Sequence, residues 1–267
     1  MTAAAPEGDK PLSDKMPRAA LVTGAAQRIG RAIALALAAD GWAVAVHYGR
    51  SRAKAEALVA EIAAQGGRAI ALGADLADEA EVERLVPHAV AALGPLGCLV
   101  NNAASFENDT VRSATRQSWD MHLAVNLRAP FVLTQGFAAQ LPGQAEGAVI
   151  NLLDERVWNL TPYFVSYTVS KMGLWTLTRT MALALAPRIR VNGIGPGPAV
   201  PSPRQTPEHF ARQSAELPLR RGTTPEEIAA ATRFILAAPA MTGQMIALDG
   251  GQHLGWAQAA GRPPPEE

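Results

Sequence analysis

Residues 23–30 read TGAAQRIG, and they join a short apolar run, Ala19–Val22, to a helical pattern that begins near Ile29. Gly24 permits a tight turn after the strand, and Gly30 lets the helix pack closely against it. The first turn of a helix offers unpaired backbone N–H groups and the positive end of the helix dipole, which together bind phosphate. The segment therefore predicts a strand–turn–helix unit that binds the pyrophosphate of a dinucleotide. An ordinary strand–turn–helix connection is the alternative.

The rest of the chain repeats this alternation of short apolar runs with longer helical patterns. Strands rich in Val, Ile, Leu and Ala, joined by helical crossovers, are typical of a parallel sheet covered on both faces. We therefore predict an α/β fold, a single doubly wound Rossmann-type domain with about seven parallel strands. The predicted strands are Ala19–Val22, Ala43–Tyr48, Ala69–Leu72, Leu96–Val100, Ala148–Leu153, Ile189–Ile194 and Met245–Leu248, and the predicted helices are Ile29–Ala39, Arg52–Gln65, Asp78–Leu93, Ser118–Gln140, Phe164–Ala186 and Pro225–Ala237.

Composition limits both the organisation and the partners of the chain. Residues 1–17 and 257–267 are expected to be flexible tails around one domain, 18–256, whose proline-rich part at about 198–218 is a candidate substrate loop. The 24 basic and 24 acidic residues cancel, so nothing points to nucleic acid or a membrane surface. With no apolar signal segment, a cytoplasmic protein is expected. The single cysteine, Cys98, lies in an apolar run and is expected to be buried and inert, and no metal site is predicted.

One tyrosine is placed for acid–base chemistry. Lys171 follows Tyr167 by four residues, so the two share a helix face, and Asp154 precedes that tyrosine by thirteen. A free phenol has a pKa of about 10, and a nearby ammonium group lowers that pKa toward the working pH. The pattern predicts a proton donor for a reaction in which hydride goes to carbon and a proton follows to the adjacent oxygen or nitrogen.

Taken together, these motifs resemble the short-chain dehydrogenase/reductase family over residues 18–255. The turn at residues 23–30 matches the family's TGxxxGxG, except that Arg28 replaces the middle glycine. The other motifs follow in family order: Asp75 after the third strand, Asn101–Ala104 after the fourth, Asn126 in the long helix, Tyr167 with Lys171, and Pro196-Gly197 after the sixth strand.

The resemblance implies roles for these residues. Tyr167 is the proton donor, Lys171 holds the nicotinamide ribose and tunes the phenol, and Asn126 helps keep a water that relays protons. For Asn126, a helix-face polar residue is the alternative. The predicted cofactor contacts are Gly24, Arg28, Ile29, Gly30, His47, Tyr48, Arg50, Ser51, Asp75, Leu76, Asn102, Ala103, Ala104, Tyr167, Lys171, Pro196, Gly197 and Pro198.

The end of the second strand predicts which nicotinamide cofactor is used. An NAD enzyme of this architecture carries an acidic residue there for the ribose 2′-hydroxyl. This chain instead has Arg50 and Ser51, and no acid before Glu56. A guanidinium pairs with a 2′-phosphate, which a carboxylate would repel. NADPH is therefore the predicted cofactor, with solvated surface charges as the alternative.

Asp154 departs from the family pattern, which has a serine that donates to a ketone oxygen. An ionised carboxylate only accepts hydrogen bonds, so it suits a ring N–H or an amino group. Arg28, Phe106 and Asp154, with the residues around Arg50, resemble the pteridine reductases and bacterial dihydromonapterin reductases of this family. The resemblance implies a pterin or dihydrofolate stacked on Phe106 and contacted by Arg28, Asp154 and Tyr167. The alternatives are a loop-packing role for Phe106 and a structural Asp154 that caps a turn or pairs with Arg156.

Two other functions remain open. An NADPH-dependent carbonyl reductase would use Tyr167, Lys171 and Asn126 in the same roles but would leave Asp154 without a specific duty. A non-catalytic NADP(H) sensor is the third reading, although such proteins often lose the tyrosine or lysine. The family also implies a homotetramer, with Leu174, Leu177, Met181, Leu254 and Trp256 serving either the interfaces or an intramolecular core.

Overall fold

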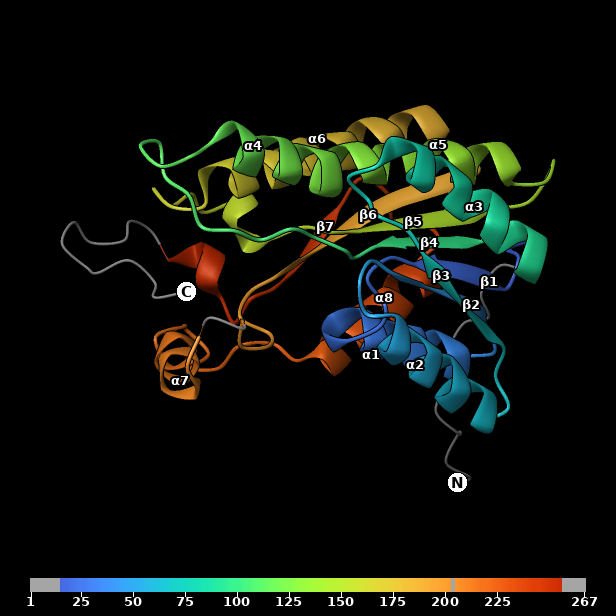
Figure 1. Ribbon diagram of the computed structural model, residues 1–267, viewed down its shortest axis with the longest axis horizontal. Helices are drawn as coiled ribbons and strands as arrows, with labels where there is room; N and C mark the ends of the chain where they lie inside the picture. The colour runs from blue at the N-terminus through green and yellow to red at the C-terminus, as the bar shows by residue number, and fades with distance from the viewer. Residues whose placement is uncertain (1–14, 203–204, 256–267) are drawn as a thin grey trace, which may run out of the picture.

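Short apolar strands form one parallel sheet in the computed structural model, which describes residues 15–202 and 205–255 (Figure 1). The predicted tails therefore lie largely outside the described residues. In the sheet the strands lie in the order β3-β2-β1-β4-β5-β6-β7. Their bounds are β1 Ala19–Val22, β2 Ala43–Tyr48, β3 Ala69–Gly73, β4 Cys98–Asn101, β5 Gly147–Leu152, β6 Ile189–Pro196 and β7 Met245–Leu248. The predicted fold class is confirmed.

Helices cover both faces of the sheet, as Figure 1 shows. The side chains of β1 alternate between the two cores: Ala20 and Val22 pack on one face, while Ala19 and Leu21 pack on the other. Each face therefore needs its own helical layer. One layer contains α1 (Arg28–Ala39), α2 (Arg52–Ala64) and α8 (Pro225–Ala237), and the other contains α3 (Glu79–Leu93), α4 (Arg116–Leu123), α5 (Ala129–Gln140) and α6 (Val165–Leu185).

The order of the strands places the functional site. The chain builds the sheet outward from β1 in one direction and from β4 in the other, so these neighbouring strands form the switch point of the topology. Ligands of doubly wound sheets bind beyond the carboxyl ends of the strands at this point. Here the turn after β1 meets the segment after β4, and the Thr23 N–H donates to the carbonyl of Val100 at 3.0 Å.

Two helical regions differ from the prediction. The helix predicted over Ser118–Gln140 is interrupted by a π-helical turn at Ala124–Arg128, and Pro130 lies in the first turn of the helix that follows. A proline lacks an N–H donor, so it is tolerated there. The proline-rich region, predicted as a loop, contains the short helix α7 (Pro207–Ala215), which is capped by Thr206.

The apolar face of α6 belongs mainly to the core. Leu174 and Met181 are 1% and 6% exposed, so they do not form an assembly surface. Trp256 lies outside the described residues, and the homotetramer stays a prediction. Cys98 is fully buried, and burial raises the pKa of its thiol to about 12, which confirms an inert cysteine.

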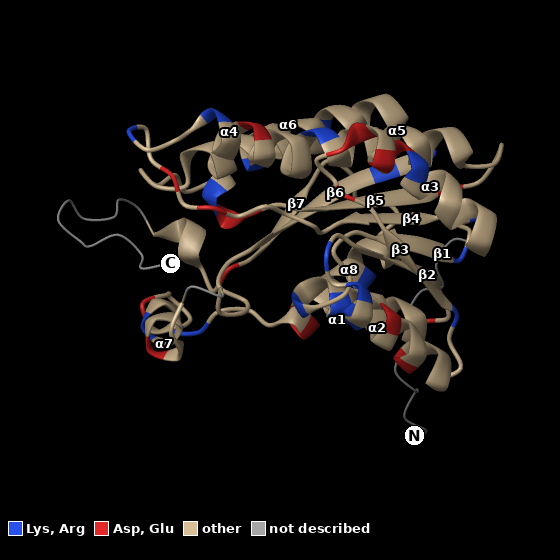
Figure 2. Cartoon of the chain, viewed as in Figure 1, with Lys and Arg blue, Asp and Glu red and all other residues tan. Residues whose placement is uncertain are grey.

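The surface charges are mixed. Figure 2 shows basic and acidic residues interspersed over the helices, while the strands carry few of them. Among the described residues, every helix is too short or too polar to cross a membrane.

Candidate active site

The turn after β1 has the backbone conformation that its glycines predict. Gly24 is left-handed, with φ +62°, and Arg28 has φ 56° at the position where the family pattern has a glycine. At Gly30, an added Cβ would lie 2.4 Å from the carbonyl oxygen of Gly24 and 2.6 Å from the side-chain nitrogen of Asn102. Only glycine allows this close approach of turn and helix.

The segment after β4 is tied to that turn by Thr23 and Asn102. The Thr23 hydroxyl accepts the backbone N–H groups of Asn102 and Ala103, at 2.9 and 3.0 Å. The Asn102 amide donates to the carbonyls of Thr23 and Gly24, at 2.7 and 3.2 Å. The predicted cofactor residue Asn102 therefore holds the two segments together as well as lining the cleft.

His47 lies beneath the turn rather than in the cleft, which corrects the predicted direct cofactor contact. The ring is 1% exposed, and its Nδ1 accepts the N–H of Gly24 at 3.0 Å. The other nitrogen, Nε2, then carries the proton and donates to the carbonyl of Ala74 at 3.1 Å. Burial lowers the pKa of His47, although the bond to Ala74 opposes the effect. His47 thus supports the turn at residues 23–30 from behind.

Arg28 reaches across the cleft to the proline-rich segment. Its guanidinium donates to the carbonyls of Val200 and Pro201, at 3.0 and 2.7 Å. These bonds were not predicted, because the sequence indicated a phosphate or substrate partner instead. A guanidinium has five N–H donors, so the loop carbonyls do not exhaust its capacity for a ligand. Partial burial lowers the pKa of Arg28.

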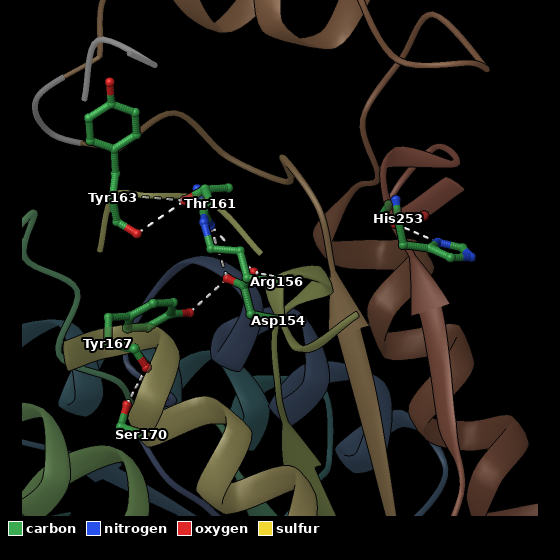
Figure 3. A network of polar contacts seen from close by, with 8 residues as sticks. Asp154, Arg156, Thr161, Tyr163, Tyr167, Ser170 and His253 are labelled. Carbon is green, nitrogen blue, oxygen red and sulfur yellow. Dashed lines mark hydrogen bonds and ion pairs between the residues drawn. The ribbon is translucent and has the colours of Figure 1, made fainter. Parts of the chain in front are cut away.

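Tyr167 and Asp154 both line the cleft, and Figure 3 shows their side chains meeting. The Tyr167 hydroxyl donates to Oδ2 of Asp154 at 2.8 Å. Tyr167 comes from the first turns of α6, and Asp154 comes from the segment that follows β5. Because a carboxylate can only accept, the phenolic hydrogen is directed at Asp154. The predicted pair is thus assembled from two elements that lie thirteen residues apart.

Lys171 lies one helical turn after Tyr167, as predicted. Its ammonium nitrogen is 5.8 Å from the centre of the tyrosine ring and donates to the carbonyl of Leu152 at 2.6 Å. The side chain is 2% exposed, so burial lowers the pKa of Lys171 to about 8, although the negative charge of Asp154 raises it. A buried ammonium beside the phenol can hold or release a proton near neutral pH.

Asp154 also has the structural role that was considered as an alternative. Its Oδ1 accepts the Arg156 N–H at 2.9 Å, and the Arg156 guanidinium pairs with the same oxygen at 3.3 Å. Glu155, between them, is 2% exposed, and burial together with Asp154 raises its pKa to about 8 while Arg156 lowers it. The segment that carries Asp154 is thus rigidly held beside the phenol.

Asn126 lies in the π-helical turn, a distortion that is frequent at functional sites. Its amide is fully engaged: Oδ1 accepts the Ser105 N–H at 2.8 Å, and Nδ2 donates to the Ser105 carbonyl and the Ser170 hydroxyl. Ser170 directly precedes Lys171. The side chain therefore joins the segment after β4 to α6, and its predicted water relay stays a prediction.

Phe106 lines the cleft but already has an aromatic partner. Its ring is stacked on that of Phe164, with centroids 4.7 Å apart and planes 2° from parallel. Tyr167 meets Phe106 edge-on at 4.7 Å, and the Arg156 guanidinium lies 4.9 Å from the centre of Phe164. The sequence analysis missed the stacking role of Phe164, which carries no recognisable motif, and considered Arg156 only as an ion-pair partner of Asp154. One face of Phe106 is therefore taken up by the protein.

The remaining predicted contacts fall into two groups. Ile29, Ala104 and Pro196–Pro198 line the cleft, which has a volume of about 250 Å³. Tyr48, Arg50, Ser51, Asp75 and Leu76 lie outside it, at and just beyond the ends of β2 and β3, where Tyr48 packs against Gly73. Arg50 is exposed and forms no ion pair with the described residues.

The helices that open onto the site are suited to phosphate. Neither α1 nor α2 has a side-chain cap or an acidic residue in its first turn. By contrast, α3 and α8 are capped by Asp78 and Thr224 and carry glutamates in their first turns. The N–H groups that begin α1 and α2 are thus not claimed by side-chain caps, and the dipole of each helix favours an anion. This end of the sheet fits a ligand with two separate phosphate groups.

Comparisons with known proteins find relatives that match most of the chain. A family model described as enoyl-(acyl carrier protein) reductase matches residues 24–253. The chain is 36% identical over 245 residues to the 3-oxoacyl-[acyl-carrier-protein] reductase FabG of Staphylococcus aureus, covering 90% of this chain and 100% of that protein.

Solved structures of greater similarity include FolM alternative dihydrofolate reductase 1 from two Brucella species, each in complex with NADP. The protein from Brucella suis is 48% identical to this chain, with a TM-score of 0.87. The match covers 91% of this chain and 97% of the Brucella suis chain. The protein from Brucella canis is 46% identical, with a TM-score of 0.89. The match covers 94% of this chain and 100% of the Brucella canis chain.

Proposed function

The chain belongs to the short-chain dehydrogenase/reductase family of oxidoreductases, and we propose that it is an NADPH-dependent reductase of a C=N bond in a pterin. The candidate substrates are a dihydropteridine, dihydromonapterin and dihydrofolate. The observation that carries the proposal is the hydrogen bond from the Tyr167 hydroxyl to Asp154, at 2.8 Å. It puts a carboxylate where a ketone reductase would need a second donor.

NADPH fits the phosphate-binding features of the site. The uncapped start of α1 would hold the pyrophosphate, and Arg50 with Ser51 at the start of α2 would hold the 2′-phosphate. Lys171 would bind the nicotinamide ribose. When bound, NADPH supplies a hydride to the carbon of the double bond. The relatives crystallised with NADP support this choice.

The protein's own part of the reaction is to supply and steer a proton. Hydride addition to carbon leaves the adjacent nitrogen with an extra electron pair, and the Tyr167 hydroxyl donates a proton to it. Asp154 orients the phenol and accepts from an N–H or amino group of the ring. Lys171, which is buried beside the phenol, stabilises the phenolate that remains. Phe106 lines the same cleft and would pack against the flat ring of the substrate.

The substrate class is tested by turnover, followed as loss of NADPH absorbance. We expect dihydrobiopterin, dihydromonapterin or dihydrofolate to be reduced with a kcat/KM at least about 100-fold above that of simple ketones and quinones. The similarity to FabG favours a carbonyl reductase as the second candidate. Reduction of ketones alone would establish that candidate, and NADPH binding without turnover of any compound would indicate a sensor.

Arg50→Ala should weaken NADPH binding selectively. Loss of a charge-assisted bond to the 2′-phosphate is expected to raise the Kd for NADPH by about tenfold, while the Kd for NADH stays within about twofold. Binding is measured by fluorescence titration. Arg52→Ala is the matched control, because Arg52 is also exposed but pairs with Glu56 at 2.7 Å. An unchanged ratio of the two dissociation constants in Arg50→Ala would remove Arg50 from the cofactor site.

A further inference from the structure

A buried chain of hydrogen bonds lies directly behind Tyr167. His122 on α4 is fully buried, and its Nδ1 is 2.7 Å from the Ser166 hydroxyl on α6. The Ser166 hydroxyl bonds to the Asp109 carboxylate, which also accepts the Ser166 N–H at 3.0 Å. On the other side of the ring, Nε2 of His122 accepts the N–H of Glu107 at 3.0 Å. The chain thus joins α4, α6 and the segment after β4.

The partners of His122 allow one protonation state. A backbone N–H can only donate, so Nε2 must carry a lone pair to meet Glu107. The ring proton is therefore on Nδ1, which donates to Ser166, and Ser166 donates in turn to Asp109. A protonated imidazole would direct a second N–H at the N–H of Glu107 and break that bond. The arrangement requires neutral His122.

The same chain links the two residues that would touch the substrate. Glu107 directly follows Phe106, and Ser166 directly precedes Tyr167. The His122 ring also meets the Tyr167 ring edge-on, with centroids 5.9 Å apart. A further bond from the Ser118 hydroxyl to Asp109, at 3.0 Å, closes the network on α4. Movement of the imidazole would therefore shift Phe106 and the start of α6.

We propose that His122 is a positioning residue: its neutral imidazole holds the Phe106 segment against the helix that carries Tyr167, and its protonation loosens that segment and weakens substrate binding. The proposal rests on the proposed function in one respect, that Phe106 contacts the substrate. His122 itself does not line the cleft.

The charges around His122 favour the neutral form on balance. Burial lowers the pKa of His122, and Asp109 and Glu107 from the segment after β4 oppose that effect. The Ser118 carbonyl also raises the pKa, while Lys171 on α6 lowers it. Arg128, the charged residue of the neighbouring π-helical turn, is already paired with Glu79. The net effect lowers the pKa of His122 below the value of about 6.5 for a free histidine. The neutral ring and its hydrogen bonds are therefore expected at neutral pH, and they are lost as the pH falls below the pKa of a free histidine.

Steady-state kinetics across pH test the proposal. In the wild type, the KM for the reduced substrate should rise by up to about tenfold per pH unit below the His122 pKa, while the Kd for NADPH stays level. His122→Gln keeps an acceptor for Glu107 and cannot titrate, so its KM should lack this acid rise. His122→Leu should have a raised KM at every pH. His88→Gln, at an exposed histidine on α3, should behave like the wild type.

A second readout needs no substrate. Hydrogen exchange of the amides in residues 104–110 should accelerate on acidification in the wild type relative to His122→Gln at the same pH. An acid rise in KM that persists in His122→Gln, or equal exchange in the two proteins, would overturn the proposal. If no pterin is reduced, the proposed function fails, yet the exchange comparison still tests His122. The two failures are therefore distinguishable.

Discussion

Tyr167→Phe should lower kcat by about 10²- to 10⁴-fold, the range over which a positioned general acid contributes. The phenylalanine ring should fit the same site, because Phe106 and His122 pack against the tyrosine ring in T-shaped contacts that do not involve the hydroxyl. What disappears is the proton that the hydroxyl directs at Asp154. The Kd for NADPH should change by less than about twofold, because the loss occurs in the transition state.

Turnover is measured by NADPH consumption with the best substrate from the panel, and cofactor affinity is measured by fluorescence titration. Tyr163→Phe is the matched control, because Figure 3 shows that ring pointing away from Asp154. It should retain the wild-type kcat. Undiminished turnover by Tyr167→Phe would show that another group donates the proton, whatever the molecule that is reduced.

Asp154→Ser should reduce kcat/KM for the pterin by about 100-fold or more and leave NADPH affinity nearly unchanged. The carboxylate orients the Tyr167 hydroxyl and would accept from the substrate ring, whereas a serine hydroxyl donates as readily as it accepts. Because a serine is the donor that a ketone needs, reduction of simple ketones should fall much less. The ratio of pterin to ketone turnover is therefore the informative measurement.

The same substitution has a cost in stability that must be separated from its effect on chemistry. Arg156 is 7% exposed, and Asp154 is an ion-pair partner at 3.3 Å. Removing one partner of a buried ion pair lowers the free energy of unfolding by about 3 kcal/mol. Thermal unfolding of the variant should therefore be measured alongside its kinetics. Asp120→Ser, at a surface pair with Arg116, is the control and should change neither. Equal losses of pterin turnover and NADPH binding would show that Asp154 is structural.

The strands and the order of motifs were predictable because each is a local property of the chain. The strand Ala43–Tyr48 begins with four apolar residues, as expected where both faces of a parallel strand are buried, and it was predicted with its observed bounds. Met245–Leu248 and Pro225–Ala237 were also predicted as observed. The four-residue spacing of Tyr167 and Lys171 sets a shared helix face whatever surrounds it.

The helical details that were missed depend on packing. Nothing in the sequence Ala124–Arg128 distinguishes a π-helical turn from a regular one. The Asn126 side chain in that turn bonds to Ser105 and Ser170, which lie on other segments. Helix α7 carries prolines on either side, which favoured a loop in the sequence, yet Thr206 caps it and Pro207 occupies its first turn, where a proline is accepted.

The chain's residues alone therefore specified the parallel sheet, the glycine turn at residues 23–30 and the tyrosine–lysine pair, because periodicity, glycine geometry and helical spacing act over a few residues. The assignment of partners came from the folded chain. Arg28 meets a loop 172 and 173 residues away, His47 supports a turn 23 residues before it, and Phe106 stacks on Phe164. A polar or aromatic side chain takes the partner that packing brings within reach, and contacts across such separations leave no periodic trace in the sequence.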